Sequence, residues 1–128
     1  MKKTYQISAV LAQNQGILDL HALRGDTFEA EISIIDLGQA RVFDFSQYAS
    51  AKMQVRKTRL DLPILEFYST VGTEIVLTAD KVTVSKDATT MAGKTSGIYL
   101  YDLQLTDISG NVYTPLSGKF IIKDDITY

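Results

Sequence analysis

Residues 97–111 constrain the fold of this chain most, because an alternating pattern of side chains runs straight into a turn. Large apolar side chains stand at every second position, namely Tyr99, Tyr101, Leu103 and Leu105. Polar residues lie between them, so the pattern predicts a strand with one face on a core and the other toward water. The sequence Ser109-Gly110-Asn111 follows, and these residues tolerate the positive φ angles that a tight reversal requires. We therefore expect a β-hairpin whose second strand starts at Val112.

Segments with the same period of two recur at short intervals along the rest of the chain. They cover residues 4–12, 17–22, 28–34, 51–56, 63–68, 74–77, 81–85 and 118–123. Short strands at regular spacing are typical of a β-sandwich. Residues 86–92 differ, since Asp87 can cap a single helical turn that Gly93 ends. These patterns predict an all-β sandwich with at most one short helical turn.

The sequence Gly97-Ile98-Tyr99 at the start of the hairpin is similar to the tyrosine corner of immunoglobulin-like sandwiches. In that motif a tyrosine hydroxyl bonds back to the backbone a few residues upstream. An ordinary buried aromatic residue would give the same short pattern. Both interpretations place the Tyr99 ring in the core.

A single domain accounts for the length of 128 residues, because domains usually have about 100–150. We expect one β-sandwich domain over residues 1–128. Residues 1–16 are an N-terminal arm or a first strand, and residues 124–128 form a short polar tail.

The charge balance and the absence of cysteine restrict the classes of function. Lys and Arg number 13 against 15 Asp and Glu, which argues against broad electrostatic binding of nucleic acid or of an anionic membrane. With no cysteine, the chain has no disulfides, no thiolate nucleophile and no cysteine-based metal site. No run approaches the ~20 apolar residues of a membrane helix. We expect neither nucleic acid nor a membrane as a partner.

Residues that could carry catalysis do not form a recognisable set. His21 is the only histidine, and no nucleophile motif accompanies it. Glu29 and Glu31 share one face of a predicted strand, where a solvated surface explains them better than a paired-carboxylate hydrolase does. The segment 107–111 lacks the terminal glutamate of a calcium loop and is interpreted as the hairpin turn. We expect no enzymatic activity, no catalytic residue, no cofactor and no metal.

Four basic residues gather within eight positions at Lys52, Arg56, Lys57 and Arg59. Nucleic-acid binding would use such charges beside stacking aromatic rings. Charges on an outward strand face that discourage pairing at an edge explain them at least as well.

Four ordered segments resemble a known family. They are residues 23–28 (LRGDTF), 44–57 (DFSQYASAKMQVRK), 97–107 (GIYLYDLQLTD) and 117–122 (SGKFII). Together they resemble the N-terminal domain of baseplate upper proteins from tailed bacteriophages and similar small virion proteins of prophages. The resemblance covers most of residues 23–127.

The resemblance implies an immunoglobulin-like antiparallel β-sandwich of about 7–9 short strands. It also implies a non-enzymatic structural component of a tailed phage or prophage particle, in the tail or baseplate or as an accessory virion protein. The chain would then be made in the host bacterial cytoplasm and be located in the virion. Its partners would be other virion proteins, and a homo-oligomer is compatible with this role.

The residues that precede the family-like region form a candidate arm for contact with a partner. The apolar positions of this arm are Tyr5, Ile7, Val10 and Leu11. The arm could add a strand to a neighbouring subunit, or it could be a strand of its own sandwich. An alternative function is a binding module of a cell-surface or carbohydrate-binding type, although such a module usually exposes tryptophan and this chain has none.

Overall fold

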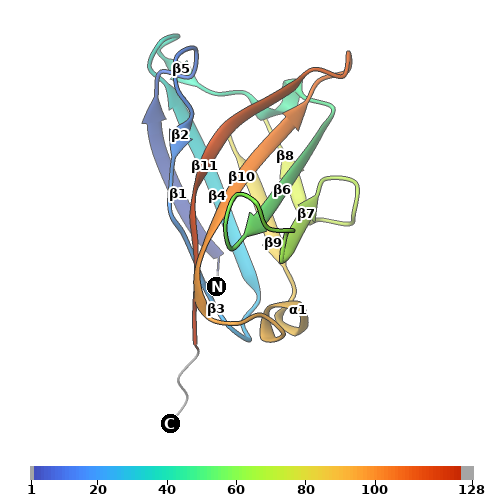
Figure 1. Ribbon diagram of the computed structural model, residues 1–128. Coiled ribbons are helices and arrows are strands. Elements are labelled where there is room, and N and C mark those ends of the chain that lie inside the picture. The colour runs from blue at the N-terminus through green and yellow to red at the C-terminus, as the bar shows by residue number, and fades with distance from the viewer. Residues whose placement is uncertain (1, 125–128) are drawn as a thin grey trace.

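Two β-sheets pack face to face in this computed structural model, which describes residues 2–124 (Figure 1). The first sheet has the order β1 (Lys2–Ala9), β4 (Phe28–Asp36), β9 (Val82–Lys86) and β8 (Ile75–Leu77), and β5 (Arg41–Val42) pairs with the end of β4. The second sheet has β2 (Gly16–Ile17) and β3 (Leu20–Leu23) on β11 (Val112–Lys123), followed by β10 (Gly97–Thr106), β6 (Ser50–Arg56) and β7 (Leu65–Tyr68). Two short helical segments, η1 (Phe45–Gln47) and α1 (Ala88–Ala92), lie between strands.

The order of the strands is that of an immunoglobulin-like sandwich. Strands β4, β9 and β8 take the places of B, E and D, and β6, β10 and β11 take those of C, F and G. The predicted all-β sandwich is therefore confirmed, and so is the helical turn after Asp87, whose carboxylate accepts a 2.6 Å hydrogen bond from the Thr90 amide.

Three details differ from the sequence-based prediction. Residues 2–124 contain eleven strands rather than the roughly 7–9 expected, and the two-residue β2 and β5 are among the additional ones. A second helical segment, η1, follows Asp44. The sandwich is also not purely antiparallel, since β1 runs parallel to β4, and both β2 and β3 run parallel to β11.

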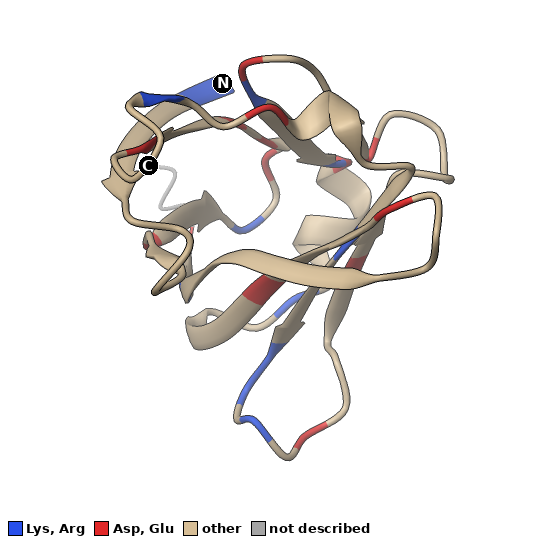
Figure 2. Ribbon diagram, turned by 90° about the horizontal axis from the view of Figure 1, so that it is seen from above, with Lys and Arg blue, Asp and Glu red and all other residues tan. Residues whose placement is uncertain are grey.

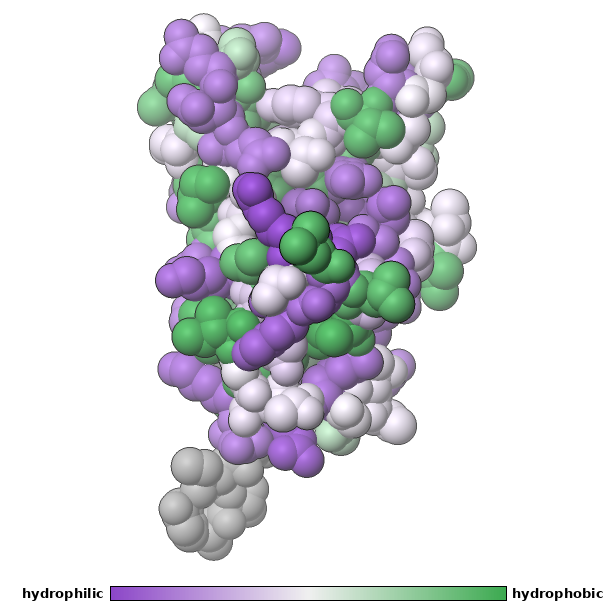
Figure 3. Space-filling model, in the orientation of Figure 1, coloured by the Kyte–Doolittle hydropathy of each residue, from purple (hydrophilic) through white to green (hydrophobic). Residues whose placement is uncertain are grey.

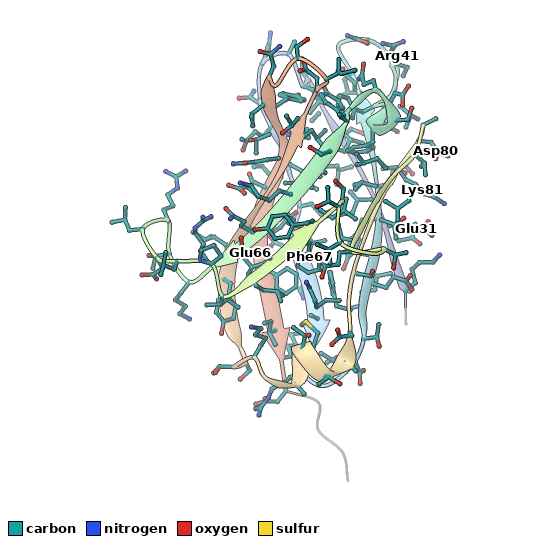
Figure 4. All side chains as sticks on the ribbon, turned by 90° about the vertical axis from the view of Figure 1, so that its right-hand side faces the viewer. Glu31, Arg41, Glu66, Phe67, Asp80 and Lys81 are labelled. Atoms are coloured by element: carbon teal, nitrogen blue, oxygen red, sulfur yellow. The ribbon has the colours of Figure 1, made fainter. Side chains whose placement is uncertain are left out.

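The core lies between the sheets and follows the predicted alternation. Every second residue of β4 is buried from Phe28 onward, and β10 buries Tyr99, Tyr101, Leu103 and Leu105. At the centre of the core, the centroid of the Phe28 ring lies 5.0 Å from the centroid of the Phe120 ring and 5.9 Å from that of the Phe67 ring. Phe67 points between the sheets in Figure 4. Aromatic side chains from both sheets thus form one continuous core.

The parallel pairs arise because the N-terminal segment crosses between the sheets. After β1 the chain leaves the first sheet, pairs with β11 as β2 and β3, and then returns as β4. The crossing is held at Leu18, whose amide donates to the Ser117 carbonyl and whose carbonyl accepts from the Tyr101 hydroxyl at 2.6 Å. A Cβ atom at Gly118 would lie 2.1 Å from the Leu18 oxygen. Only glycine permits this approach.

The tyrosine corner is confirmed at the start of β10. The Tyr99 hydroxyl donates a 2.6 Å hydrogen bond to the carbonyl of Thr95, four residues upstream. The ring is buried, and the Lys57 ammonium lies 5.1 Å from its centroid. This bond ties the segment after α1 to the strand that it enters.

Removing the Tyr99 hydroxyl should destabilise the fold, because the Thr95 carbonyl loses its partner while the buried ring stays. We expect Tyr99→Phe to lower the free energy of unfolding by about 1–2 kcal/mol, as measured by urea denaturation. Tyr68→Phe is the matched control, since the Tyr68 hydroxyl bonds to the Glu66 carboxylate at the edge of the second sheet and should cost less than about 0.5 kcal/mol. Equal effects of the two changes would contradict a special role for the corner.

Candidate interaction surface

The carboxylates considered for catalysis are engaged in structural contacts. Glu31 forms ion pairs with Lys2 and Lys81 on the outer face of the first sheet (Figure 4). The hydrogen bond from Lys2, and then that from Lys81, lower the pKa of Glu31. The Asp107 carboxylate accepts from the amides of Ser109 and Asn111, both at 2.9 Å, and these bonds lower its pKa. Glu31 therefore lies in a solvated ion-pair network, and Asp107 is a turn residue as expected.

Within residues 2–124, no group of three or more acidic or histidine side chains is placed to hold a metal ion. The same part of the chain contains no helix long and apolar enough to cross a membrane. His21 lies on β3, where its backbone carbonyl accepts from the Lys3 ammonium. Two surfaces of the domain are hollowed, one on the second sheet and one at an end of the sandwich.

One such surface is the outer face of the second sheet, which we call the front face because it faces the viewer in Figure 1. It carries the outward side chains of β6, β10 and β11, including Ile98 and Leu100, which are 57% and 39% exposed. A groove of about 440 Å³ crosses it, lined in part by Ile17, Leu100 and Arg56. Hydrophobic and hydrophilic residues are interspersed across this face in Figure 3. A mixed composition of this kind is compatible with a protein contact.

A loop of residues 57–62 projects from this face between β6 and β7 (Figure 2). Its two leucines, Leu60 and Leu62, are 98% and 86% exposed. The base of the loop is fixed, because the Arg56 guanidinium donates to the Asp61 carbonyl and to the Gln54 side chain. The loop therefore holds two large apolar side chains in water, without a packing partner among residues 2–124.

The predicted basic cluster divides between a strand and this loop. Lys52 and Arg56 lie on the outward side of β6, whereas Lys57 and Arg59 belong to the loop. Lys57 is partly engaged, since its ammonium lies 3.5 Å from the Ile98 carbonyl and over the Tyr99 ring. Arg59 is exposed beside the two leucines.

The candidate arm lies along its own first sheet in this single chain. Tyr5 and Ile7 point inward from β1 and are partly buried, and β1 pairs with β4 from Lys2 to Ala9. Val10 and Leu11 form the turn that follows, in which Leu11 is buried. Exchange of this arm with a neighbour stays a prediction.

A second surface is a cleft of about 410 Å³ at the end of the sandwich opposite α1, where Figure 4 places Arg41. We call it the aromatic cleft. Its apolar wall is formed by three partly buried rings, namely Phe43 and Tyr48 from one segment and Tyr113 from β11. The centroids of these rings lie 5.9–6.3 Å apart. Tyr48 stacks on Phe43 at an interplanar angle of 24° and on Tyr113 at 23°, whereas Phe43 and Tyr113 are tilted by 48°. Leu11 closes the side next to β1.

The polar wall of the aromatic cleft carries two carboxylates, two side-chain amides and one guanidinium. Asp36 is 7% exposed and accepts from the Gly38 amide, and Asp44 accepts from the Ser46 amide at the start of η1. Burial and then the Asp107 charge raise the pKa of Tyr48. Burial raises the pKa of Tyr113, and the nearby charges of Tyr48 and Asp36 raise it further. The residues that line the cleft include two carboxylates, Asp36 and Asp44, and one cation, Arg41.

Sequence analysis did not predict the aromatic cleft, because its walls come from four separate segments. One feature of the β4 sequence does indicate a polar site at this end of the sandwich. The buried alternation that starts at Phe28 reaches Asp36 at its fifth inward position, and a carboxylate in an inward register is costly unless it has a partner or a role.

No protein-family model matches this chain, and no curated protein is similar enough in sequence to count as a match. The resemblance to baseplate upper proteins therefore stays a prediction. The surfaces themselves are the observations on which a function can be proposed.

The exposed leucines should contribute little to folding, since neither touches the core. We expect the double variant Leu60→Ser/Leu62→Ser to change the free energy of unfolding by less than about 0.5 kcal/mol. Leu103→Ser, at a fully buried position of β10, should cost more than about 3 kcal/mol. Urea denaturation compares the three proteins, and a large loss in the loop variant would show that the loop packs on the domain.

Proposed function

We propose that this protein is a non-enzymatic assembly component of a tailed phage or prophage particle. It acts through contacts with other virion proteins, in the tail or baseplate or as an accessory part. In this proposal the chain is made in the host bacterial cytoplasm and is located in the virion. The observation that carries the proposal is the projecting loop 57–62 with its two exposed leucines.

The free energy available from burying the two exposed leucines favours a role in binding. Full burial of a leucine side chain is worth about 1.5–3 kcal/mol, and here that gain is not used within the chain. A projecting apolar tip with charged neighbours matches the centre and rim of a protein interface. The fixed base at Arg56 lowers the entropy that the loop loses on binding.

The first sheet adds a second means of contact. Strand β1 is the last strand at its side of the sheet order, so its outer edge can accept a strand from a neighbour. Lys2 and Lys3 lie at one end of this edge, where positive charge opposes indiscriminate pairing. A selective edge of this kind suits a subunit of an ordered assembly.

The alternative function, a carbohydrate-binding module, is favoured by one observation. Sugar rings stack on exposed aromatic faces, and the aromatic cleft offers Tyr48 and Tyr113 beside polar Gln39, Gln47 and Asp44. The phage proposal ranks first because it also accounts for the loop.

Assembly is the measurement that tests the proposed function. We expect the chain, alone or co-expressed with the products of the genes beside its own, to form defined complexes larger than a monomer. Light scattering after size-exclusion chromatography gives the mass, and negative-stain microscopy shows the shape. A protein that stays monomeric with every such product, at concentrations up to about 1 mM, would contradict the proposal.

The alternative makes a separate prediction for a glycan array and for titration with the bound sugar. A monomeric protein that binds a defined glycan, and that loses at least about tenfold in affinity on Tyr48→Ala, would support the carbohydrate module. Tyr68→Ala, at an aromatic residue of β7 that does not line the cleft, is the matched control.

A further inference from the structure

We infer that loop 57–62 of one copy inserts into the aromatic cleft of a second copy, so that the chain assembles head to tail. This inference rests on the proposed function and names one of its contacts. It follows from three properties of the two surfaces, namely their shape, their polarity and their charge.

The loop and the cleft are complementary in shape and polarity. Leu60 and Leu62 are almost fully exposed on a projection, whereas the cleft is a hollow of about 410 Å³ with an apolar wall. Aliphatic side chains pack well on aromatic rings, and insertion would remove both apolar surfaces from water. The partly buried rings of Tyr48 and Tyr113 have exposed area left to bury.

The charges are complementary as well. The loop carries Lys57 and Arg59 against Asp61, so it is positive overall. The cleft carries Asp36 and Asp44 against Arg41, so it is negative overall. Opposite potentials raise the rate of association and exclude other orientations.

The cleft must belong to another copy. In Figures 1 and 2 the loop projects outward from the front face, away from the body of the sandwich. The cleft lies at the end of the sandwich where Figure 4 labels Arg41. Because the two surfaces are different parts of one molecule, each copy has one loop to donate and one cleft to fill. Such a contact is heterologous, and it produces rings or filaments rather than a symmetric dimer.

Two variants test this contact by removing one half each. Leu60→Ser/Leu62→Ser removes the apolar tip of the loop. Gln47→Arg places bulk and positive charge at an exposed position that lines the cleft, where it repels Arg59. Thr89→Arg makes the same change at an exposed position of α1, at the other end of the molecule, and is the matched control. Thermal unfolding checks that each variant is folded.

We expect the unchanged protein and Thr89→Arg to form species larger than a dimer in light scattering. The loop variant alone and the cleft variant alone should each associate at least about tenfold more weakly. An equimolar mixture of the two should form a dimer and nothing larger, because only one intact loop and one intact cleft remain per pair.

Disulfide trapping provides a second measurement that also detects weak association. The chain has no cysteine, so Leu60→Cys in one copy and Gln47→Cys in another should form a mixed disulfide-linked dimer under mild oxidation. A mixture of Leu60→Cys with Thr89→Cys should form far less of a mixed dimer.

The outcomes separate this inference from the proposed function. If the chain assembles but both variants assemble as well as the unchanged protein, the head-to-tail contact is wrong and the proposed function stands. The same conclusion follows if the mixture forms species as large as the unchanged protein, or if Leu60→Cys links equally to both partners. A monomeric chain whose cleft binds a trisaccharide such as maltotriose would overturn the inference and favour the carbohydrate module.

Discussion

The close contact between Leu18 and Gly118 is the constraint on which the rest of the structure depends. It holds the N-terminal segment on the second sheet, with the Tyr101 hydroxyl on the Leu18 carbonyl as a second tie. From this point the chain returns to the first sheet as β4, which supplies the centre of the core. The same segment also brings the turn at Leu11 to the Tyr113 hydroxyl, 3.3 Å from the Leu11 carbonyl. One wall of the aromatic cleft therefore depends on this crossing.

Side-chain periodicity predicted the strands that have one face in water and the other in the core. Strands β4, β6 and β10 are of this kind, and alternation specifies them because each inward residue gains the same burial. The two-residue β5 escaped prediction, since its partner strand defines it rather than its own sequence, and the single strand predicted over residues 17–22 divides into β2 and β3. The parallel direction of β1 also could not be predicted, because a period of two is the same whichever way a strand runs.

The candidate surfaces were less predictable for a different reason. The arm residues Tyr5 and Ile7 were found because they belong to one periodic segment. The aromatic cleft brings Phe43 and Tyr48 together with Tyr113 of β11, which is far away in sequence, so only the fold unites these rings. The basic cluster was recognised but assigned to a strand face. Two of its four residues, Lys57 and Arg59, lie in a loop because β6 ends at Arg56. The Arg56 side chain donates to the Asp61 carbonyl, and this bond closes the turn before Pro63.

The side chains that stabilise the fold and the two exposed leucines are different parts of this domain, so the core is complete without the leucines. The core side chains at Phe28, Phe67 and Phe120 close the space between the sheets without help from the loop. Because Leu60 and Leu62 contribute nothing to that core, their exposure is a cost that folding does not repay. Burial of the two leucines against a partner would recover this free energy, and the loop, fixed at its base, would lose little further entropy. Changes in the loop can therefore alter the partner while the sandwich stays the same.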